Sequence, residues 1–243
     1  MTIKSSRETF SSIFSINELK IIIMDTKKIE LIGDNHELFS LETPLRDDAF
    51  VKSNDEKIKN IEKHFTKIVD ELGLDLNDDS ISGTPYRVAK MYVKEIFSGL
   101  DPENKPKISL FDNKYNYNKM LIEKNINLNS TCEHHFLPIT GKAHVSYISS
   151  GKVIGLSKLN RIVQYYSHRP QVQERLTKQI YDELKNVLDT DSVMVVIEAK
   201  HMCVSSRGIK DYTSSTVTEM YGGDFNIYNK RDEFYKLLNS VNI

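Results

Sequence analysis

The chain has 243 residues, of which 39% are hydrophobic and 28% are charged, a composition typical of one large globular domain or one domain with extensions. Its formal net charge of −1 argues against nucleic-acid binding driven by the charge of the whole molecule. No apolar run is long enough to cross a bilayer, and the N-terminus carries no signal-peptide pattern, so we expect a cytoplasmic protein in a reducing compartment, with no membrane partner.

The N-terminal part of the chain divides into an extension and two helices. Residues 1–55 show no sustained periodicity and are predicted to be an extension that is loosely packed or disordered. Hydrophobic residues then recur at helical spacing over about 56–72, and Gly73 follows where a helix C-cap is expected. A second helix is predicted to begin at Thr84, with the threonine as N-cap and the next proline as first helical residue, and to end near Gly99.

The rest of the chain alternates between strands and helices. Strand-like alternation covers about 117–147, and a helix is predicted from Ser157, as its N-cap, to about His168. Pro170 interrupts this helix, and a longer helix follows over 172–188. The remaining predicted elements are a strand over 192–199, a strand over 213–221 and a short helix near 232–238. This order indicates an α+β fold with an antiparallel sheet.

Each of the two cysteines lies beside histidine. Cys132 precedes His134 and His135, and Cys203 follows His201. Thiolate and imidazole together are ligands that suit zinc. Cys132 and His135 are spaced to chelate one ion from a turn, whereas His201 and Cys203 would share one face of a strand. Cys132, His135 and Cys203 supply three ligands, which favours a catalytic zinc site because such a site leaves its fourth position to water.

Two other interpretations of the cysteines remain open from the sequence. Both thiols could be small buried hydrophobic residues that lie near histidine by chance. Cys132 and Cys203 could also form a disulfide, which would require an oxidising compartment.

A basic stretch lies between the two Cys/His clusters. Residues 151–178 contain six lysines and arginines and a single acid, Glu174. Lys158 and Arg161 share a face in the first turn of a predicted helix, where backbone N–H groups also favour an anion. A bound polyphosphate would explain this pair, and a solvated basic face without a ligand is the alternative. Arg207 follows the second cluster and adds a guanidinium near the predicted metal.

Glu174 has two interpretations, and Gln173 precedes it in the chain. The spacing alone favours an i,i+4 ion pair between Glu174 and Lys178. The alternative is a carboxylate that accepts hydrogen bonds from a ligand such as the edge of a guanine.

These motifs together closely resemble one family, GTP cyclohydrolase I. The resemblance covers about residues 56–240, so residues 1–55 lie outside it. The segment Thr84-Pro85-Tyr86-Arg87-Val88-Ala89-Lys90-Met91 is similar to the N-terminal helix signature of that family. The other matching motifs are Cys132-Glu133-His134-His135-Phe136-Leu137-Pro138, Gly155-Leu156-Ser157-Lys158-Leu159-Asn160-Arg161, Gln171-Val172-Gln173-Glu174-Arg175-Leu176-Thr177, and His201-Met202-Cys203 with Arg207-Gly208.

The resemblance implies an architecture for the chain. The expected fold is the tunnelling fold, an antiparallel sheet with helices on one face, preceded by an N-terminal helical region. Residues 56–243 would form the catalytic domain, including those helices. Identical chains would assemble into rings that stack in pairs, with active sites between subunits.

The resemblance also implies an activity. The enzyme would convert GTP to 7,8-dihydroneopterin triphosphate and formate, the first step of tetrahydrofolate or tetrahydrobiopterin biosynthesis. It would use Zn²⁺ held by Cys132, His135 and Cys203, with His134 and His201 as proton-transfer groups. The resemblance therefore favours the ligand-binding interpretation of Glu174. The implied substrate-binding residues are Glu174 and Gln173 for guanine, Lys158, Arg161, Arg207, Lys90 and Arg87 for triphosphate, and Ser157.

Two alternatives come from other functional classes. An enzyme of the same fold, such as a 7-deazaguanine nitrile reductase, would use a cysteine nucleophile, whereas both cysteines here are expected to bind metal. A non-catalytic zinc-binding protein would have no need of His134 and His201 beside its ligands. A metal assay distinguishes a zinc-dependent cyclohydrolase from a nitrile reductase. Formate release from GTP distinguishes it from a non-catalytic zinc-binding protein.

Overall fold

The structure is a computed structural model that describes residues 40–240. Residues 1–39 and 241–243 lie outside the described part, so the predicted loose packing or disorder of residues 1–55 falls mostly outside it. Within residues 40–240, no helix is both long enough and apolar enough to span a membrane.

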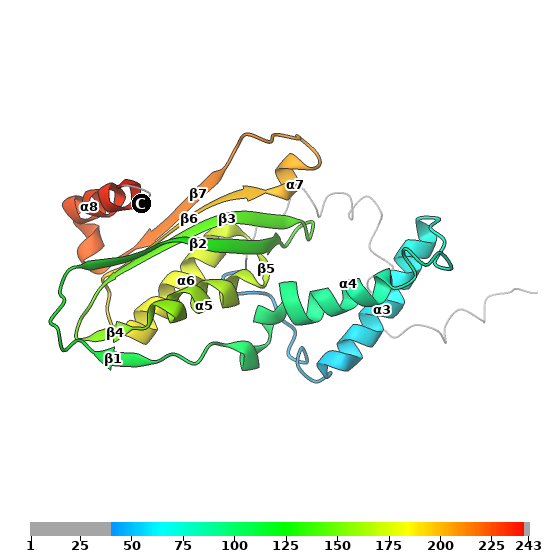
Figure 1. Cartoon of the computed structure of the whole chain (residues 1–243), viewed down its shortest axis with the longest axis horizontal. Helices are drawn as coiled ribbons and strands as arrows, with labels where there is room; N and C mark the ends of the chain where they lie inside the picture. The colour runs from blue at the N-terminus through cyan, green and yellow to red at the C-terminus, as the bar shows by residue number, and fades with distance from the viewer. Residues whose placement is uncertain (1–39, 241–243) are drawn as a thin grey trace, which may run out of the picture. The chain divides into compact units, whose positions relative to one another are not determined.

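Two helices open the described part of the chain (Figure 1). The helix α3 (Asn54–Glu71) begins with a capping box, in which the backbone N–H of Glu56 donates to Ser53 Oγ and the Glu56 carboxylate accepts from the Ser53 backbone. The helix α4 (Thr84–Met91) begins one residue earlier than predicted. Its N-cap is Gly83 rather than Thr84, because the Gly83 carbonyl accepts the first helical hydrogen bond.

Short irregular helices continue from α4. The chain passes through a π-helical turn η1 (Tyr92–Ile96) and the 3₁₀ turns η2 (Ser98–Leu100) and η3 (Pro102–Asn104). Gly99 in η2 lies directly against α5, because a Cβ at this position would come within 1.9 Å of the Tyr165 carbonyl oxygen. The helical region is thereby packed closely onto the rest of the domain.

A five-stranded sheet forms the centre of the domain, in the order β5-β2-β3-β6-β7 (Figure 1). Its members are β2 (Met120–Cys132), β3 (Pro138–Ile148), β5 (Pro170–Gln171), β6 (Val193–His201) and β7 (Thr216–Tyr221). All neighbours pair antiparallel except β5, which lies parallel to β2. A separate antiparallel pair joins β1 (Leu110–Asp112) to β4 (Lys152–Ile154).

Helices α5 (Leu156–Ser167) and α6 (Gln173–Leu188) cover one face of the sheet, which confirms the predicted α+β fold (Figure 1). The N-cap of α5 is Gly155, so Ser157 lies inside the first turn and the prediction of Ser157 as N-cap is wrong. Residues such as Ile162, Val163 and Ile180 are fully buried between these helices and the sheet.

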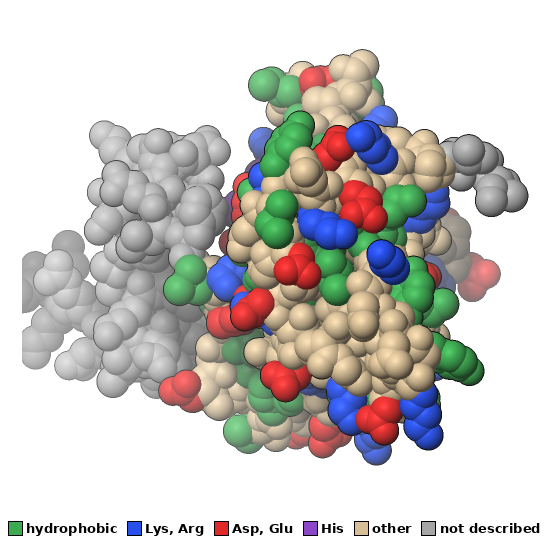
Figure 2. Space-filling model, turned by 90° about the vertical axis from the view of Figure 1, so that its left-hand side faces the viewer, with side chains coloured by type: hydrophobic (Ala, Val, Ile, Leu, Met, Phe, Trp, Pro, Cys, Tyr) green, Lys and Arg blue, Asp and Glu red, His purple; other side chains and the backbone are tan. Residues whose placement is uncertain are grey.

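The opposite face of the sheet is covered in part by the C-terminal segment. The strand β6 alternates, with Val195 and Ile197 toward α5 and α6, and Met194 and Val196 toward η4 (Gly223–Asn226) and α8 (Tyr228–Asn239). Both faces of β6 are therefore buried over residues 193–197. On the surface shown in Figure 2, acidic and basic side chains are intermixed rather than gathered by sign, in keeping with the net charge of −1.

The antiparallel register brings the two Cys/His clusters to one end of the sheet. Thr131 of β2 pairs with Pro138 of β3, and Ile139 pairs with His201 of β6. The end of β2, the start of β3 and the end of β6 therefore coincide. Segments separated by some seventy positions in sequence meet at this end because of topology alone.

Candidate active site

Three of the predicted ligands come together at this end of the sheet. The ligand atoms of Cys132, His135 and Cys203 all lie within 4.8 Å of one another. Cys132 is the last residue of β2, and His135 lies in the turn that follows it. Cys203 lies in the short helix α7 (Met202–Ser205), so the expectation that it shares a strand with His201 is wrong. The helical turn nevertheless carries its thiol to the other two ligands.

The donor set fits a zinc ion. Ligand distances of about 2.0–2.3 Å place the corners of a tetrahedral zinc site roughly 3.5–3.8 Å apart, so a small closure of this cluster suffices. Burial and the neighbouring Cys132 thiol raise the pKa of Cys203 to about 11. Two adjacent thiols resist ionising together, and a cation between them removes this penalty. Both cysteines are free thiols here, so the disulfide alternative is not the arrangement found.

The turn that carries His135 is braced from two sides. The backbone N–H of Cys132 donates to Leu137 O at 2.8 Å, and that of Phe136 donates to Cys132 O at 2.9 Å. Phe136 has a φ of 53°, an uncommon conformation for a bulky residue. Its ring packs against Phe97 at 5.1 Å and Tyr92 at 6.5 Å between centroids. These aromatic contacts hold the strained residue in place, and the sequence alone did not indicate them.

His134 lies between the predicted ligand Cys132 and the carboxylate of Glu133. Its Nδ1 is 3.6 Å from the Cys132 sulfur, and its Nε2 is 4.0 Å from Oε1 of Glu133. The other carboxylate oxygen of Glu133 is ion-paired with the buried guanidinium of Arg175. His134 is exposed, so its ring adjoins the metal cluster while remaining accessible to a substrate.

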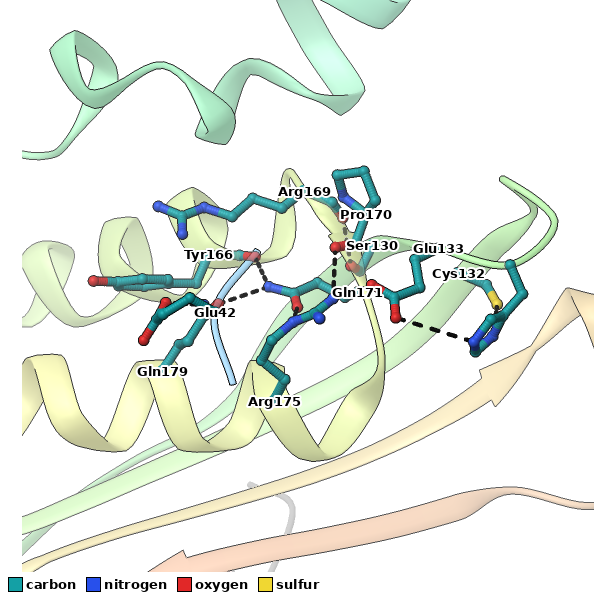
Figure 3. A network of polar contacts seen from close by, with 11 residues as sticks. Glu42, Ser130, Cys132, Glu133, Tyr166, Arg169, Pro170, Gln171, Arg175 and Gln179 are labelled. Atoms are coloured by element: carbon teal, nitrogen blue, oxygen red, sulfur yellow. Dashed lines mark hydrogen bonds and ion pairs between the residues drawn. The ribbon is translucent and has the colours of Figure 1, made fainter. Parts of the chain in front are cut away.

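Arg175 is the centre of a buried polar network that sequence reasoning missed (Figure 3). Its guanidinium also donates to Gln171 Oε1 at 3.0 Å and to Pro170 O at 3.1 Å. Gln171 donates in turn to Gln179 at 2.9 Å, and Gln179 donates to Glu42 at 2.7 Å. The network links the turn that follows β2 to the segment that precedes α3. From the sequence, Arg175 was only one cation of a basic stretch.

His201 lies at the end of β6, against the start of α6. Its Nε2 is 2.8 Å from Oε1 of Gln173, whose side chain is 1% exposed. Burial lowers the pKa of His201, and the carboxylate of Glu174 opposes that shift. Glu174 itself is exposed, and Lys178 pairs with Asp182 at 2.6 Å. The i,i+4 pair of Glu174 with Lys178 that spacing favoured is therefore not formed.

Most of the basic stretch serves the protein's own structure. Lys158 extends to the Lys107 carbonyl at 2.7 Å, and Arg161 is exposed on α5. The other four cations have partners within the domain: Lys152 with Asp112, Arg169 with Gly99 O and the rings of Tyr165 and Tyr166, Arg175 with Glu133, and Lys178 with Asp182. Of the predicted anion-binding pair, Lys158 is thus also hydrogen-bonded within the domain, although to a backbone carbonyl and not to a carboxylate.

That pair lies far from the metal cluster of its own chain. Asn160, next to Arg161, donates to Glu123 of β2 at 3.2 Å, whereas Cys132 ends the same strand. A bulge between Glu123 and Ile126 takes up one of the nine steps from Glu123 to Cys132. At about 3.3 Å per remaining strand residue, this interval spans roughly 26 Å. Arg207 is different, since its guanidinium donates to His135 Nε2 at 2.9 Å. Only part of the predicted phosphate-binding set therefore adjoins the cluster.

The remaining predicted residues lie in the N-terminal helical region and in α5. Arg87 and Lys90 are exposed on α4, and Arg87 donates to Thr84 Oγ1 at 3.0 Å. Ser157 is exposed in the first turn of α5.

The chain is similar in sequence to known proteins over most of its length. Residues 61–239 match the family model of GTP cyclohydrolase I. The chain is 60% identical over 206 residues to GTP cyclohydrolase 1 of Flavobacterium johnsoniae, covering 85% of this chain and 92% of that protein. It is 51% identical over 200 residues to the protein of that name from Vibrio parahaemolyticus, covering 82% and 91%. It is 49% identical over 218 residues to that from Citrobacter koseri, covering 89% and 98%.

Proposed function

The chain belongs to the GTP cyclohydrolase I family, and from that premise we propose how its own residues carry out the reaction. The enzyme acts on GTP at the first step of folate or pterin biosynthesis. Water adds at C8 of the purine and opens the imidazole ring, a second hydrolysis releases formate, and the ribose rearranges onto the freed amine to give 7,8-dihydroneopterin triphosphate. The alternative of a nitrile reductase is thereby set aside.

The observation that carries the proposal is the cluster of Cys132, His135 and Cys203. The His134 ring contacts Cys132, and His201 precedes Cys203 by two residues. The three residues of the cluster would hold Zn²⁺. When bound, zinc supplies Lewis acidity that lowers the pKa of a water to about 7. A purely structural zinc site would gain nothing from additional imidazoles.

His134 and His201 are the proposed proton-transfer groups. Histidine titrates near neutral pH, so one ring can protonate purine N7, which makes C8 electrophilic, and later protonate the departing nitrogen. The exposed carboxylate of Glu174 would accept hydrogen bonds from the guanine edge, with Gln173 beside it. Glu174 and Gln173 open α6 next to His201, so guanine bound there would place its reacting ring near the imidazole.

The triphosphate would be bound by Lys158, Arg161 and Arg207, with Arg87, Lys90 and Ser157. Arginine pairs with phosphate through a planar fork, and this remote binding energy would hold C8 in place. Lys158 and Arg161 lie on α5 near the Glu123 end of β2, and Glu123 is roughly 26 Å along the sheet from Cys132 at about 3.3 Å per residue. One chain therefore cannot present both groups to one GTP. We infer that a second copy supplies them, in a homo-oligomer of stacked rings with active sites between subunits.

The domain boundary and location follow the same proposal. Residues 56–243 would form the catalytic domain with its N-terminal helices, after an extension over 1–55. A cytoplasmic location would keep both thiols reduced for metal binding.

The experiment that tests the function is incubation of the purified chain with GTP, with and without a chelator. Formate and the absorbance of the pterin should both increase, and the chelator should abolish both. Zinc retained without formate release would indicate a metal-binding protein instead of this enzyme. Measurement of the mass of the assembly tests the oligomer separately.

A further inference from the structure

The side-chain amide of Gln173 is buried and held by four partners. Its Nε2 lies 3.1 Å from Ile197 O, 3.0 Å from Thr216 O and 3.1 Å from Thr218 Oγ1. Its Oε1 lies 2.8 Å from His201 Nε2. The partners belong to β6 and β7, so the amide joins α6 to two strands of the sheet.

The chemistry of these partners fixes which end of the amide faces the imidazole. Backbone carbonyls only accept hydrogen bonds, so the NH₂ group must face Ile197 and Thr216. An amide turned the other way would place its oxygen against two carbonyl oxygens. The oxygen of Gln173 therefore faces His201.

A chain of hydroxyl groups supports the same orientation. Thr177 Oγ1 donates its hydrogen to Gln173 O at 2.8 Å, so it must accept at its 2.6 Å contact with Thr218 Oγ1. The Thr218 hydroxyl therefore donates its hydrogen to Thr177 and can only accept from the Gln173 amide. All hydrogen bonds in this chain therefore have the same donor-to-acceptor direction, from the Gln173 amide through Thr218 and Thr177 to the Gln173 backbone carbonyl.

The orientation determines where the hydrogen of His201 lies. An amide oxygen can only accept, so Nε2 of His201 must carry the hydrogen, whether the ring is neutral or charged. We propose that Gln173 is a positioning residue that holds His201 with its hydrogen on Nε2 and so leaves Nδ1 as the atom that exchanges a proton with the substrate. The catalytic half of this inference rests on the proposed function, whereas the tautomer does not.

This role differs from binding guanine through the Gln173 side chain. Both the NH₂ group and the oxygen of the Gln173 amide make hydrogen bonds to the protein. A contact to guanine would therefore have to use the Gln173 backbone. Loss of a substrate contact should mainly raise KM, whereas loss of an orienting partner should mainly lower kcat.

The direct test is the tautomer of His201 in the full chain saturated with zinc. The chain has seven histidines, so solid-state NMR of ¹⁵N-histidine-labelled protein can identify the His201 signals by their loss in His201→Ala. We expect a protonated Nε2. A neutral ring with its hydrogen on Nδ1 would overturn the inference. This spectrum requires no turnover, so failure of GTP hydrolysis would count against the proposed function alone.

A variant tests the catalytic half. Gln173→Met keeps the length of the side chain and removes the acceptor. It should populate both tautomers and lower kcat about tenfold or more, with KM for GTP changed less than about threefold. A raised KM with unchanged kcat would assign Gln173 to substrate binding, and an unchanged tautomer would show that something else orients the ring. If the variant does not fold, the wild-type spectrum decides.

Thr218→Val is the matched control. It removes one acceptor of the amide but leaves both carbonyls, so the orientation of Gln173, the tautomer and kcat should persist. A mixture of tautomers in this variant would overturn the argument that the carbonyls of Ile197 and Thr216 fix the orientation of the Gln173 amide.

Discussion

Two ion pairs that involve α6 differ in burial and should differ in what they contribute to stability. Arg175 pairs with Glu133 and has a side chain only 3% exposed, whereas that of Glu133 is 20% exposed. Lys178 pairs with Asp182 one turn away, with side chains 49% and 43% exposed. Arg175→Met removes the first pair with little change in volume, and Lys178→Met removes the second.

The expected costs follow from solvation. Removing one partner of a buried pair leaves an uncompensated charge and costs about 3–5 kcal/mol. Because Glu133 keeps some access to water, we expect about 3 kcal/mol, including the lost bonds to Gln171 and Pro170. An exposed pair within one helix is worth roughly 0.3–0.5 kcal/mol, so Lys178→Met should have little effect.

Urea unfolding followed by circular dichroism, at one fixed protein concentration, measures both variants. The double variant Arg175→Met with Glu133→Gln should recover part of the loss, since no buried carboxylate is then left unpaired. The reasoning is refuted if Arg175→Met costs no more than Lys178→Met. That result would mean that water or another group neutralises Glu133.

Four further predictions concern the site and the response to pH. Cys203→Ala should lose zinc and activity, and full zinc by elemental analysis would disprove its role as a ligand. Arg161→Ala should weaken GTP binding far more than guanosine binding in calorimetry, and equal losses would indicate a structural role. His134→Ala and His201→Ala should each retain zinc and lower turnover about a hundredfold or more. Burial lowers the pKa of His144, so the unfolded chain takes up a proton first below about pH 6.5 and stability should fall there. His144→Gln should flatten this fall in urea unfolding measured from pH 7 to 5, and an unchanged slope would contradict the assignment.

Most helices and strands depend on local sequence patterns and could therefore be predicted from the sequence. Helical spacing of hydrophobic residues predicted α3 and α6, and the β-branched run predicted β6. The predicted N-caps Thr84 and Ser157 were wrong by one and two residues. Helix ends are difficult to assign because neighbouring residues can each supply the carbonyl that accepts the first helical hydrogen bond.

The chemistry of the site was also largely present in the sequence. The identity and spacing of Cys132, His135 and Cys203 predicted the cluster that the structure brings together. Residue type determines which ligands a side chain can bind, and short sequence spacing limits how far apart two side chains can lie. Both properties can therefore be inferred without knowing the fold.

Only the tertiary structure decided which partners the polar groups choose. Arg175 pairs with Glu133, Lys178 pairs with Asp182 and not with Glu174, and the amide of Gln173 faces His201. It also separated Arg161 along the sheet from the cluster of Cys132, His135 and Cys203. Such choices depend on burial and direction, because a charge or amide removed from water must find its hydrogen bonds among whatever the packing of distant segments places beside it.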